Sequence, residues 1–249
     1  NERGDAAVHD TARDLTNRPR WVDYSADNPE AIRDFYEQLF GWSWSISDDP
    51  QYGGYAMAMV GEHSAAGLGG KQDPSLPSFW SLYFGTDDIN ALSQKVRDAG
   101  GSVVMEPFDV GDQGQMAVYQ DPSGGTFSAW QGQGAGDFTF ATPNAFSWAE
   151  LNARGVEKLL PFYEQVFGWG IKNTEMADTT EPYYEFHIGG DSILGAWEMN
   201  PMVPEEVPTY WQVYFNTDDV DATYAKALTL GASELVPPQD FPGGRFAIL

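Results

Sequence analysis

Two acidic residues stand in the same setting at two places in the chain. Asp23 follows Trp21 by two positions, and Glu150 follows Trp148 by two positions. In a strand, residues two apart lie on one face, so each carboxylate shares a face with a tryptophan. Burial on such an aromatic face raises the pKa of a carboxyl group, which suits a general acid or base. We predict catalytic roles; a salt bridge, a backbone hydrogen bond or an outward orientation is the alternative.

His187, in the stretch YYEFHI, is the third candidate for proton transfer. An imidazole titrates near neutral pH and could exchange a proton with Glu150. A single histidine in a strand more often has a structural role, and that is the alternative for this residue.

Two further motifs indicate structure rather than chemistry. The pairs Asp87-Asp88 and Asp218-Asp219 precede predicted helices, where aspartate side chains cap the backbone. The stretch GLGGK at 67–71 lacks the Ser or Thr and the spacing of a phosphate-binding loop, so we predict a strand end or hairpin there.

The chain contains an internal repeat. WVDYSADNPEAIRDFYEQLFGW begins at Trp21 and WAELNARGVEKLLPFYEQVFGW begins at Trp148, so their FYEQ and FGW motifs share one offset of 127 residues. FWSLYFGTDDINA at 79 similarly matches YWQVYFNTDDVDA at 210. This repetition predicts two similar domains. We expect a mobile N-terminal extension at 1–19, a first domain at 20–132, a Gly-rich linker at 133–143 and a second domain at 144–249.

Each domain is predicted to contain β-α-β-β-β units. A strand at 21–26 leads into Asp27-Asn28-Pro29, which can begin a helix, and apolar residues at helical spacing continue to Phe40. Gly41 is expected to end that helix. A second unit starts with the strand at 79 and contains the turn DPSGG at 121–125. The second domain reaches only FAIL, so we expect it to lack the last hairpin of the first.

The composition excludes several classes of function. The 37 acidic against 13 basic residues give a net charge of −24, and such a surface repels the phosphates of nucleic acids. No apolar run is long enough for a membrane span, and the N-terminal residues do not resemble a secretory signal. The absence of cysteine excludes disulfides and thiolate chemistry. We therefore expect a cytoplasmic protein.

Several of these features together resemble the vicinal oxygen chelate superfamily: the paired β-α-β-β-β units, the FYEQLFGW and FYEQVFGW helix ends, the TDDI and TDDV helix starts and the DPSGG turn. This superfamily includes glyoxalase I, bleomycin-resistance proteins, fosfomycin-resistance enzymes and extradiol dioxygenases. The resemblance covers residues 20 to 249. It implies an α+β fold of two tandem glyoxalase-like domains, each a pair of βαβββ units curled into an eight-stranded cup. It does not fix the reaction.

Catalytic members of this superfamily hold a divalent metal in the cup with His, Glu or Gln side chains. The resemblance places those positions at or near Trp21 with Asp23, Ser81 and Ser128 in the first domain, and at Trp148 with Glu150 and Gln212 in the second. A divalent ion needs three or four converging nitrogen or oxygen ligands. We therefore predict no metal site and no cofactor.

The same faces mix aromatic rings with a few polar groups, as small-molecule pockets do. The predicted ligand-binding residues are Trp21, Ser81, Tyr83, Ser128 and Trp130 in the first domain, and Trp148, Tyr210, Gln212 and Tyr214 in the second. The alternative for the tryptophans is that they only fill the space of a metal site.

We predict a metal-independent member of this superfamily that binds an aromatic or polycyclic, polyketide-like molecule in bacterial secondary metabolism. Its reaction would be an acid–base dehydration, cyclisation or isomerisation. The first alternative is a drug-binding protein without catalysis, similar to bleomycin-resistance proteins, and the second is a metal-dependent oxygenase or hydroxylase. The expected partner is a small molecule rather than nucleic acid or membrane, and the chain is expected to be a monomer or homodimer.

Overall fold

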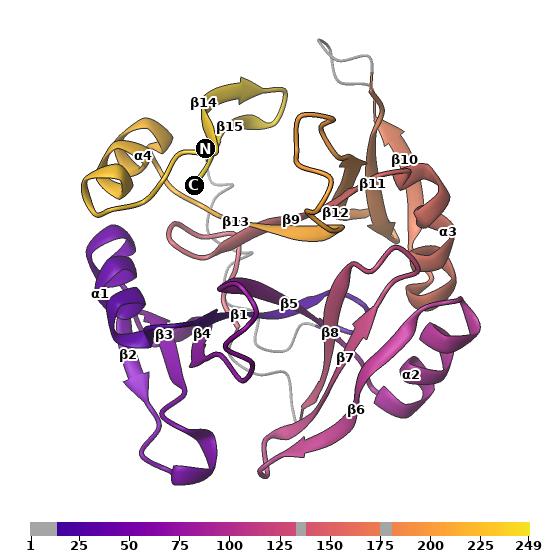
Figure 1. Ribbon diagram of the computed structural model, residues 1–249, viewed down its shortest axis with the longest axis horizontal. Helices are drawn as coiled ribbons and strands as arrows, with labels where there is room; N and C mark the ends of the chain where they lie inside the picture. Colours follow the sequence, from indigo (N-terminus) through magenta and orange to yellow (C-terminus); the bar gives the residue numbers. More distant parts are fainter. Residues whose placement is uncertain (1–13, 133–137, 175–180) are drawn as a thin grey trace. The chain divides into compact units, whose positions relative to one another are not determined.

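The computed structural model describes residues 14–132, 138–174 and 181–249. The chain has an α+β fold in which strand–helix–strand units repeat along the sequence (Figure 1). No helix within these ranges is long and apolar enough to cross a membrane.

The first half of the chain contains two such units. The first consists of β1 (Pro19–Ala26), α1 (Pro29–Phe40), β2 (Ser43–Ile46), a 3₁₀ turn (Pro50–Tyr52), β3 (Ala56–Val60) and β4 (His63–Gly70). The second consists of β5 (Phe79–Gly85), α2 (Ile89–Asp98), β6 (Ser102–Val110), β7 (Gly114–Gln120) and β8 (Thr126–Gly132). Their strands form one mixed sheet in the order β2-β3-β4-β1-β5-β8-β7-β6, so the eight-stranded sheet predicted for this half is confirmed.

The second half repeats this plan with fewer strands. Its first unit consists of β9 (Phe146–Ala153), α3 (Val156–Phe167), β10 (Gly170–Thr174), β11 (Tyr183–Ile188) and β12 (Asp191–Glu198). Its second consists of β13 (Tyr210–Phe215), α4 (Val220–Thr229), β14 (Val236–Phe241) and β15 (Gly244–Ile248). The sheets have the orders β10-β11-β12-β9-β13 and β14-β15. The cup predicted for this half was expected to lack its last hairpin; the described part contains seven strands in two sheets and no strand equivalent to β8.

Local sequence explains where the helices begin. Side chains accept hydrogen bonds from the first turns of α1, α2 and α4, which confirms the predicted caps at Asn28, Asp88 and Asp219. Helix α3 lacks a cap from its own N-cap side chain, since Gly155 occupies that position. The Glu198 carboxylate of β12 replaces it and accepts from the N–H groups of Gly155 and Val156 at 2.8 and 2.9 Å.

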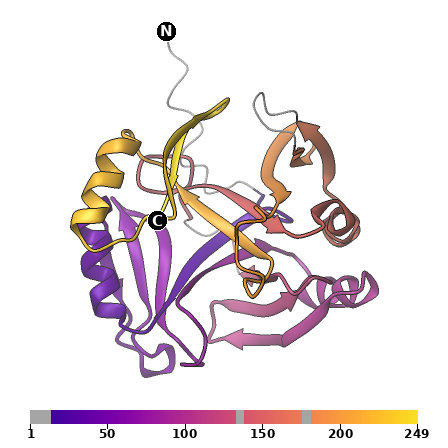
Figure 2. The same cartoon turned by 45° about the horizontal axis from the view of Figure 1, so that its top comes forward.

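The chain divides into two compact units, and each takes residues from both halves of the sequence. Unit 1 contains residues up to 23, 80–138 and 148–214, and unit 2 contains 24–79, 139–147 and 215–249. Within unit 1, α2 lies against β6 and β7, and α3 lies against the strands β10 to β12 (Figures 1 and 2). Within unit 2, α1 lies against β4, and α4 lies against the β14–β15 hairpin. The domain boundaries derived from the repeat stay predictions.

Aromatic rings form the core of unit 1. Phe167 and Trp169 stack with their centroids 4.4 Å apart, and Phe84 of β5 lies 4.9 Å from Phe167. Tyr163 of α3 meets the edge of Trp211 of β13 at 5.4 Å. The apolar stripe of α3 therefore packs against strands from both halves of the sequence, and part of the high aromatic content is core packing.

Unit 2 uses the equivalent residues of the other copy of the repeat. Tyr36 stacks on Trp42 at 5.0 Å, and Phe40 lies 5.7 Å from Phe215. A small apolar cluster lies beside these rings and contains Ala26, Ala56 and Leu68 with Tyr24, Ile32 and Trp44 packed against it.

The tryptophans of the two FGW motifs hold the turns that precede β1 and β9. In unit 1, Trp169 Nε1 donates to the Asn17 carbonyl at 2.7 Å, and in unit 2, Trp42 Nε1 donates to the Asn144 carbonyl at 2.7 Å. Both asparagines have positive φ angles, 59° and 65°, which asparagine adopts more readily than most residues. Each tryptophan thus fixes the turn that belongs to the other copy of the repeat.

Parts of the predicted extension and linker, 1–13 with His9 and 133–137, lie outside the described residues. In the described part of the extension, the Asn17 N–H donates to the Gly85 carbonyl at 2.8 Å, and β1 already begins at Pro19. In the described part of the linker, Phe138 and Thr139 are buried. These residues are therefore tied to the fold.

Candidate functional site

Glu150 of β9 lies on the face of its sheet that is opposite helix α3. The strand register aligns Glu150 with Gly195 of β12, and Gly195 with Glu185 of β11. Residues aligned in this way share one face of a sheet. The adjacent residue Phe186 points to the other face, where it packs 5.9 Å from Tyr163 of α3. The alternation predicted for this strand therefore sets Glu150 apart from the helix-covered core.

Two tyrosine hydroxyl groups donate to the Glu150 carboxylate, and an indole group orients one of them. Tyr214 Oη donates to Glu150 Oε1 at 3.3 Å, and the Tyr183 hydroxyl donates a further hydrogen bond to the carboxylate. Trp148 Nε1 in turn donates to Tyr183 Oη at 3.0 Å. We call this group, with Tyr210, the Glu150 site; it contains Trp148, Glu150, Tyr183, Tyr210 and Tyr214.

Gly195 leaves the space that this arrangement requires. A Cβ atom at position 195 would overlap the Tyr183 hydroxyl and would lie 3.0 Å from Trp148 Nε1. The side chains of Tyr183 and Trp148 therefore meet above the Gly195 backbone, beside Glu150. A larger residue at 195 would separate the tyrosine from the carboxylate.

Burial controls the protonation of the Glu150 site. Burial raises the pKa of Glu150 above its ordinary value of 4.5, and hydrogen bonds from Tyr183 and Tyr214 oppose this shift. Burial, followed by the negative charge of Glu150, also raises the pKa of Tyr183, Tyr210 and Tyr214. The tyrosines therefore keep their protons at neutral pH and act as donors, whereas Glu150 can accept or release one.

The first half of the chain carries an equivalent pair in unit 1. Tyr83 Oη donates to Asp23 Oδ2 at 3.0 Å, and these residues correspond to Tyr214 and Glu150 in the repeat. Ser128 of β8 aligns with Tyr83 and is only 3% exposed. We call Trp21, Asp23, Tyr83 and Ser128 the Asp23 site. Trp21 packs edge-on against Phe138 at 5.5 Å, so its ring has a structural contact whatever else it binds.

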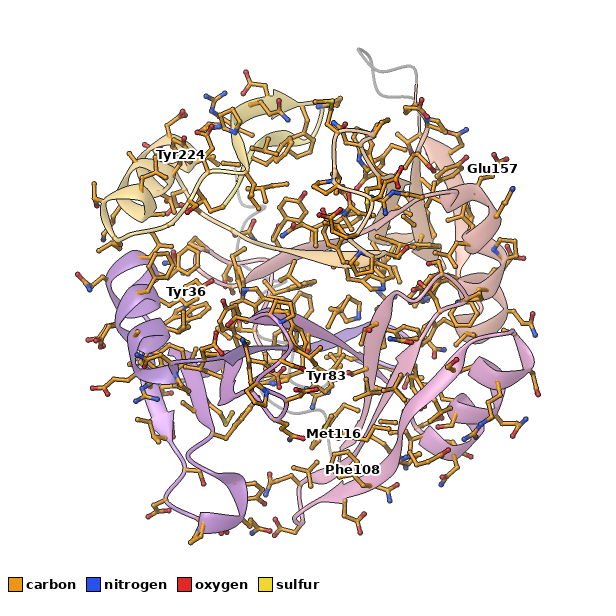
Figure 3. The ribbon with its side chains drawn as sticks, viewed as in Figure 1. Tyr36, Tyr83, Phe108, Met116, Glu157 and Tyr224 are labelled. Carbon is orange, nitrogen blue, oxygen red and sulfur yellow. The ribbon has the colours of Figure 1, made fainter. Side chains whose placement is uncertain are left out.

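An apolar wall continues from the Asp23 site along the sheet of unit 1. The register aligns Gly85 with Trp130, Trp130 with Met116, and Met116 with Phe108. Figure 3 shows Tyr83, Met116 and Phe108 on the side of these strands away from α2. Trp130, which was predicted to bind a ligand, thus belongs to a partly exposed face. Ser81, which was also predicted to bind a ligand, is half-buried and lies two positions before Tyr83 on β5.

The structure groups His187 with a different carboxylate from the one proposed. Its Nε2 atom lies 4.0 Å from Glu185 Oε2. His187 is four residues along β11 from Tyr183, which is about 13 Å at the usual rise of a strand. The proposed proton-transfer pair of His187 with Glu150 stays a prediction, while the contact that the structure shows for the imidazole is with Glu185. The amide of Gln212 is also engaged, since it donates to the Val213 carbonyl at 3.2 Å.

The side chains at the metal positions of the resemblance do not fit a divalent ion. The Asp23 site offers one carboxylate with hydroxyl groups, and the Glu150 site offers one carboxylate with phenols. Across the described ranges, no three His, Cys, Asp or Glu residues form a group that could hold a metal. Divalent ions in proteins require more carboxylate, imidazole or thiolate ligands than these sites supply.

Sequence reasoning missed Tyr183, Gly195 and Glu185. Tyr183 was identifiable in principle, because the alternation of YYEFHI places it on the same face as His187. Its partners were not, because Trp148 and Tyr183 are 35 residues apart and meet only through the register of β9, β11 and β12.

Replacing Gly195 by Ala is expected to disrupt the Glu150 site. The new Cβ would displace the Tyr183 hydroxyl, so we expect the Trp148 fluorescence environment to change. The affinity for a small molecule that binds at this site should fall by about tenfold, the equivalent of one lost hydrogen bond. The matched control is Gly190→Ala in the β11–β12 turn, where a Cβ meets no atom within 4 Å. Equal affinities in both variants would contradict this role of Gly195.

Comparisons with known proteins bear on this architecture. A sequence model of the Glyoxalase/Bleomycin resistance protein/Dioxygenase superfamily matches residues 18–128 and 145–249. Anthracycline biosynthesis protein DnrV of Streptomyces peucetius is 35% identical over 247 residues, covering 93% of this chain and 88% of that protein. Anthracycline biosynthesis protein DauV of a Streptomyces strain is 34% identical with the same coverage. The crystal structure of the Mn(II)-bound glyoxalase from Novosphingobium aromaticivorans superposes with a TM-score of 0.62 at 16% identity, covering 93% of this chain and 82% of that one, which is a likeness of fold.

Proposed function

Because this chain belongs to the Glyoxalase/Bleomycin resistance protein/Dioxygenase superfamily, we propose that its Glu150 site binds an aromatic, polyketide-like molecule and changes it by proton transfer without a metal. The observation that carries the proposal is the position of Glu150. Its carboxylate is half-buried, has a pKa that this burial raises, and accepts hydrogen bonds from Tyr183 and Tyr214. Partly desolvated carboxylates of this kind serve as general bases and acids.

The surroundings of Glu150 support an aromatic ligand. Tyr183 and Tyr214 donate to the carboxylate, Trp148 donates to Tyr183, and the charge of Glu150 acts on Tyr210. Each of these four aromatic side chains combines a flat apolar surface with a polar tip. The names of the two Streptomyces relatives place those proteins in anthracycline biosynthesis, which favours a fused-ring polyketide over a small aliphatic substrate.

In the proposed reaction, the ionised Glu150 carboxylate removes a proton from a substrate carbon next to a carbonyl group. Each phenol has one proton, so Tyr214 and Tyr183 first donate to ionised Glu150; once Glu150 has taken the substrate proton, they can turn their O–H groups to the oxygen on which negative charge develops. If the proton returns to another carbon, the product is an isomer. If a hydroxyl group leaves from the neighbouring carbon and takes the proton, the products are a new double bond and water. Both outcomes balance without an oxidant or reductant.

Product analysis with hydroxyanthraquinones and their partly reduced, hydroxylated analogues tests the proposal. We expect the protein to bind these compounds and to convert some of the reduced analogues to isomers or to products lighter by one water, with the same rate in the presence of a chelator. Liquid chromatography with mass spectrometry distinguishes the outcomes. Tight binding with every ligand recovered unchanged would replace catalysis by sequestration, and a lack of binding would overturn the proposal.

A further inference from the structure

The sheet face that carries Glu150 holds a second acidic residue in line with it. Glu185 of β11 and Glu150 of β9 both align with Gly195 of β12, so one glycine separates them. Two strand spacings correspond to about 10 Å between their backbones. The side chains of Tyr183 and Trp148 meet over this glycine. The two carboxylates thus lie at opposite ends of one sheet face, and aromatic side chains lie between them.

The carboxylate of Glu185 is already ordered by neighbouring hydroxyl groups. Thr174 Oγ1 donates to Glu185 Oε2 at 2.7 Å, and Ser192 Oγ donates to Glu185 Oε1 at 3.0 Å. Burial opposes the ionisation of Glu185, but these two hydrogen bonds together with the nearby His187 and Lys172 outweigh it and lower the pKa. We call Thr174, Glu185, His187 and Ser192 the Glu185 cluster. Both oxygens of its carboxylate accept hydrogen bonds from hydroxyl groups of the protein.

His187 is the member of the cluster whose hydrogen bonding is incomplete. Its Nε2 atom is enclosed, yet among the residues that the structure describes it has no hydrogen-bond partner. The 4.0 Å separation from Glu185 Oε2 is too long for a hydrogen bond. The side chain remains 23% exposed, so a molecule on this face can contact the ring, although Nε2 itself is enclosed. A buried polar atom without a partner is unfavourable and is a suitable place for a ligand group.

We propose that the Glu185 cluster is a second recognition point for the ligand of the Glu150 site, with His187 Nε2 bonded to a hydroxyl group at the far end of that ligand. This inference rests on the proposed function and narrows it. The ligand is an elongated system of three or four fused rings with its reactive group over Glu150. A polar substituent lies at the opposite end, about 12 Å away, because His187 is two strand spacings across and two residues along from Glu150.

Two anthraquinones that differ at one end test this inference. 2-Hydroxyanthraquinone carries a hydroxyl group at one end of its three rings, and 2,6-dihydroxyanthraquinone carries one at each end. We expect the wild-type protein to bind the dihydroxy compound about tenfold more tightly, measured by quenching of tryptophan fluorescence, because it gains one hydrogen bond. His187→Leu is expected to remove this preference and to leave the affinity for the monohydroxy compound unchanged.

Two variants serve as controls. His187→Gln keeps a polar nitrogen near the position of Nε2 and is expected to restore part of the preference. His63→Leu changes a histidine of unit 2 and is expected to retain all of it. Equal wild-type affinities for the two compounds would overturn the inference while leaving the proposed function standing, and so would a His187→Leu variant that keeps the preference. If wild type binds neither compound, the proposed function and this inference both fail.

Discussion

Replacement of Glu150 by Gln is expected to lower kcat by about 10²–10⁴-fold, the usual contribution of a general acid or base. Glutamine has nearly the same size and can still accept a hydrogen bond from Tyr214, but it cannot take a proton. Ligand affinity should therefore change far less than kcat. Steady-state kinetics with separate binding measurements on the same variant distinguish the two effects.

Glu157→Gln is the matched control for this prediction. It makes the same chemical change on the exposed side of α3 (Figure 3), and we expect wild-type kinetics. Asp23→Asn decides between the two equivalent sites, since the site whose variant loses kcat is the one that moves the proton. Full turnover in both Glu150→Gln and Asp23→Asn would exclude proton transfer by either carboxylate.

The raised pKa of Glu150 also predicts a pH dependence. As a general base Glu150 must be ionised, so the rate should rise with pH through a pKa above 4.5. The contribution of Glu150 to the free energy of unfolding changes with pH in the opposite direction to the rate. A raised folded-state pKa contributes stability below pH 4.5, and this contribution is lost as pH rises through the folded-state value. Glu150→Gln should therefore gain stability relative to wild type between pH 4 and pH 8, measured as a difference in Tm.

The second large effect is expected from Asp121→Ala, which should destabilise the fold by about 3–5 kcal/mol. Asp121 lies in the DPSGG turn and is only 3% exposed. Its Oδ1 accepts from Ser123 N at 2.8 Å and Gly125 N at 2.9 Å, and its Oδ2 accepts from Tyr163 Oη at 2.7 Å. Alanine would leave these buried donors without an acceptor.

Denaturant or thermal unfolding measures this loss, since about 1 kcal/mol shifts Tm by about 2–4 °C in a chain of this size. Tyr163→Phe removes one of the hydrogen bonds and should have a smaller effect, about 1–3 kcal/mol. Asp112→Ala changes an exposed aspartate in a neighbouring turn and should stay within about 0.5 kcal/mol of wild type. A wild-type Tm for Asp121→Ala would show that the turn does not hold unit 1 together.

The Asp121 turn also makes a long-range contact that its sequence pattern does not predict. DPSGG is recognisable as a hairpin turn from its residues alone. Its aspartate, however, binds Tyr163, which belongs to the other copy of the repeat. A repeat reveals which segments are alike, but it contains no information about which apolar faces are buried against each other. That is why unit 1 joins residues 80–138 to residues 148–214, although the repeat suggested a boundary between them.

The sequence by itself determined the family, the order of strands and helices, the helix caps and the strand positions of Asp23 and Glu150. These follow from local preferences and from the period of two along a strand, which act over a few residues. Only the tertiary structure decided that Tyr83 contacts Asp23, that Tyr183 and Tyr214 contact Glu150, and that His187 belongs with Glu185. Such contacts depend on strand register and on space such as that above Gly195. A shift of one residue in register would place each of these side chains on the opposite face.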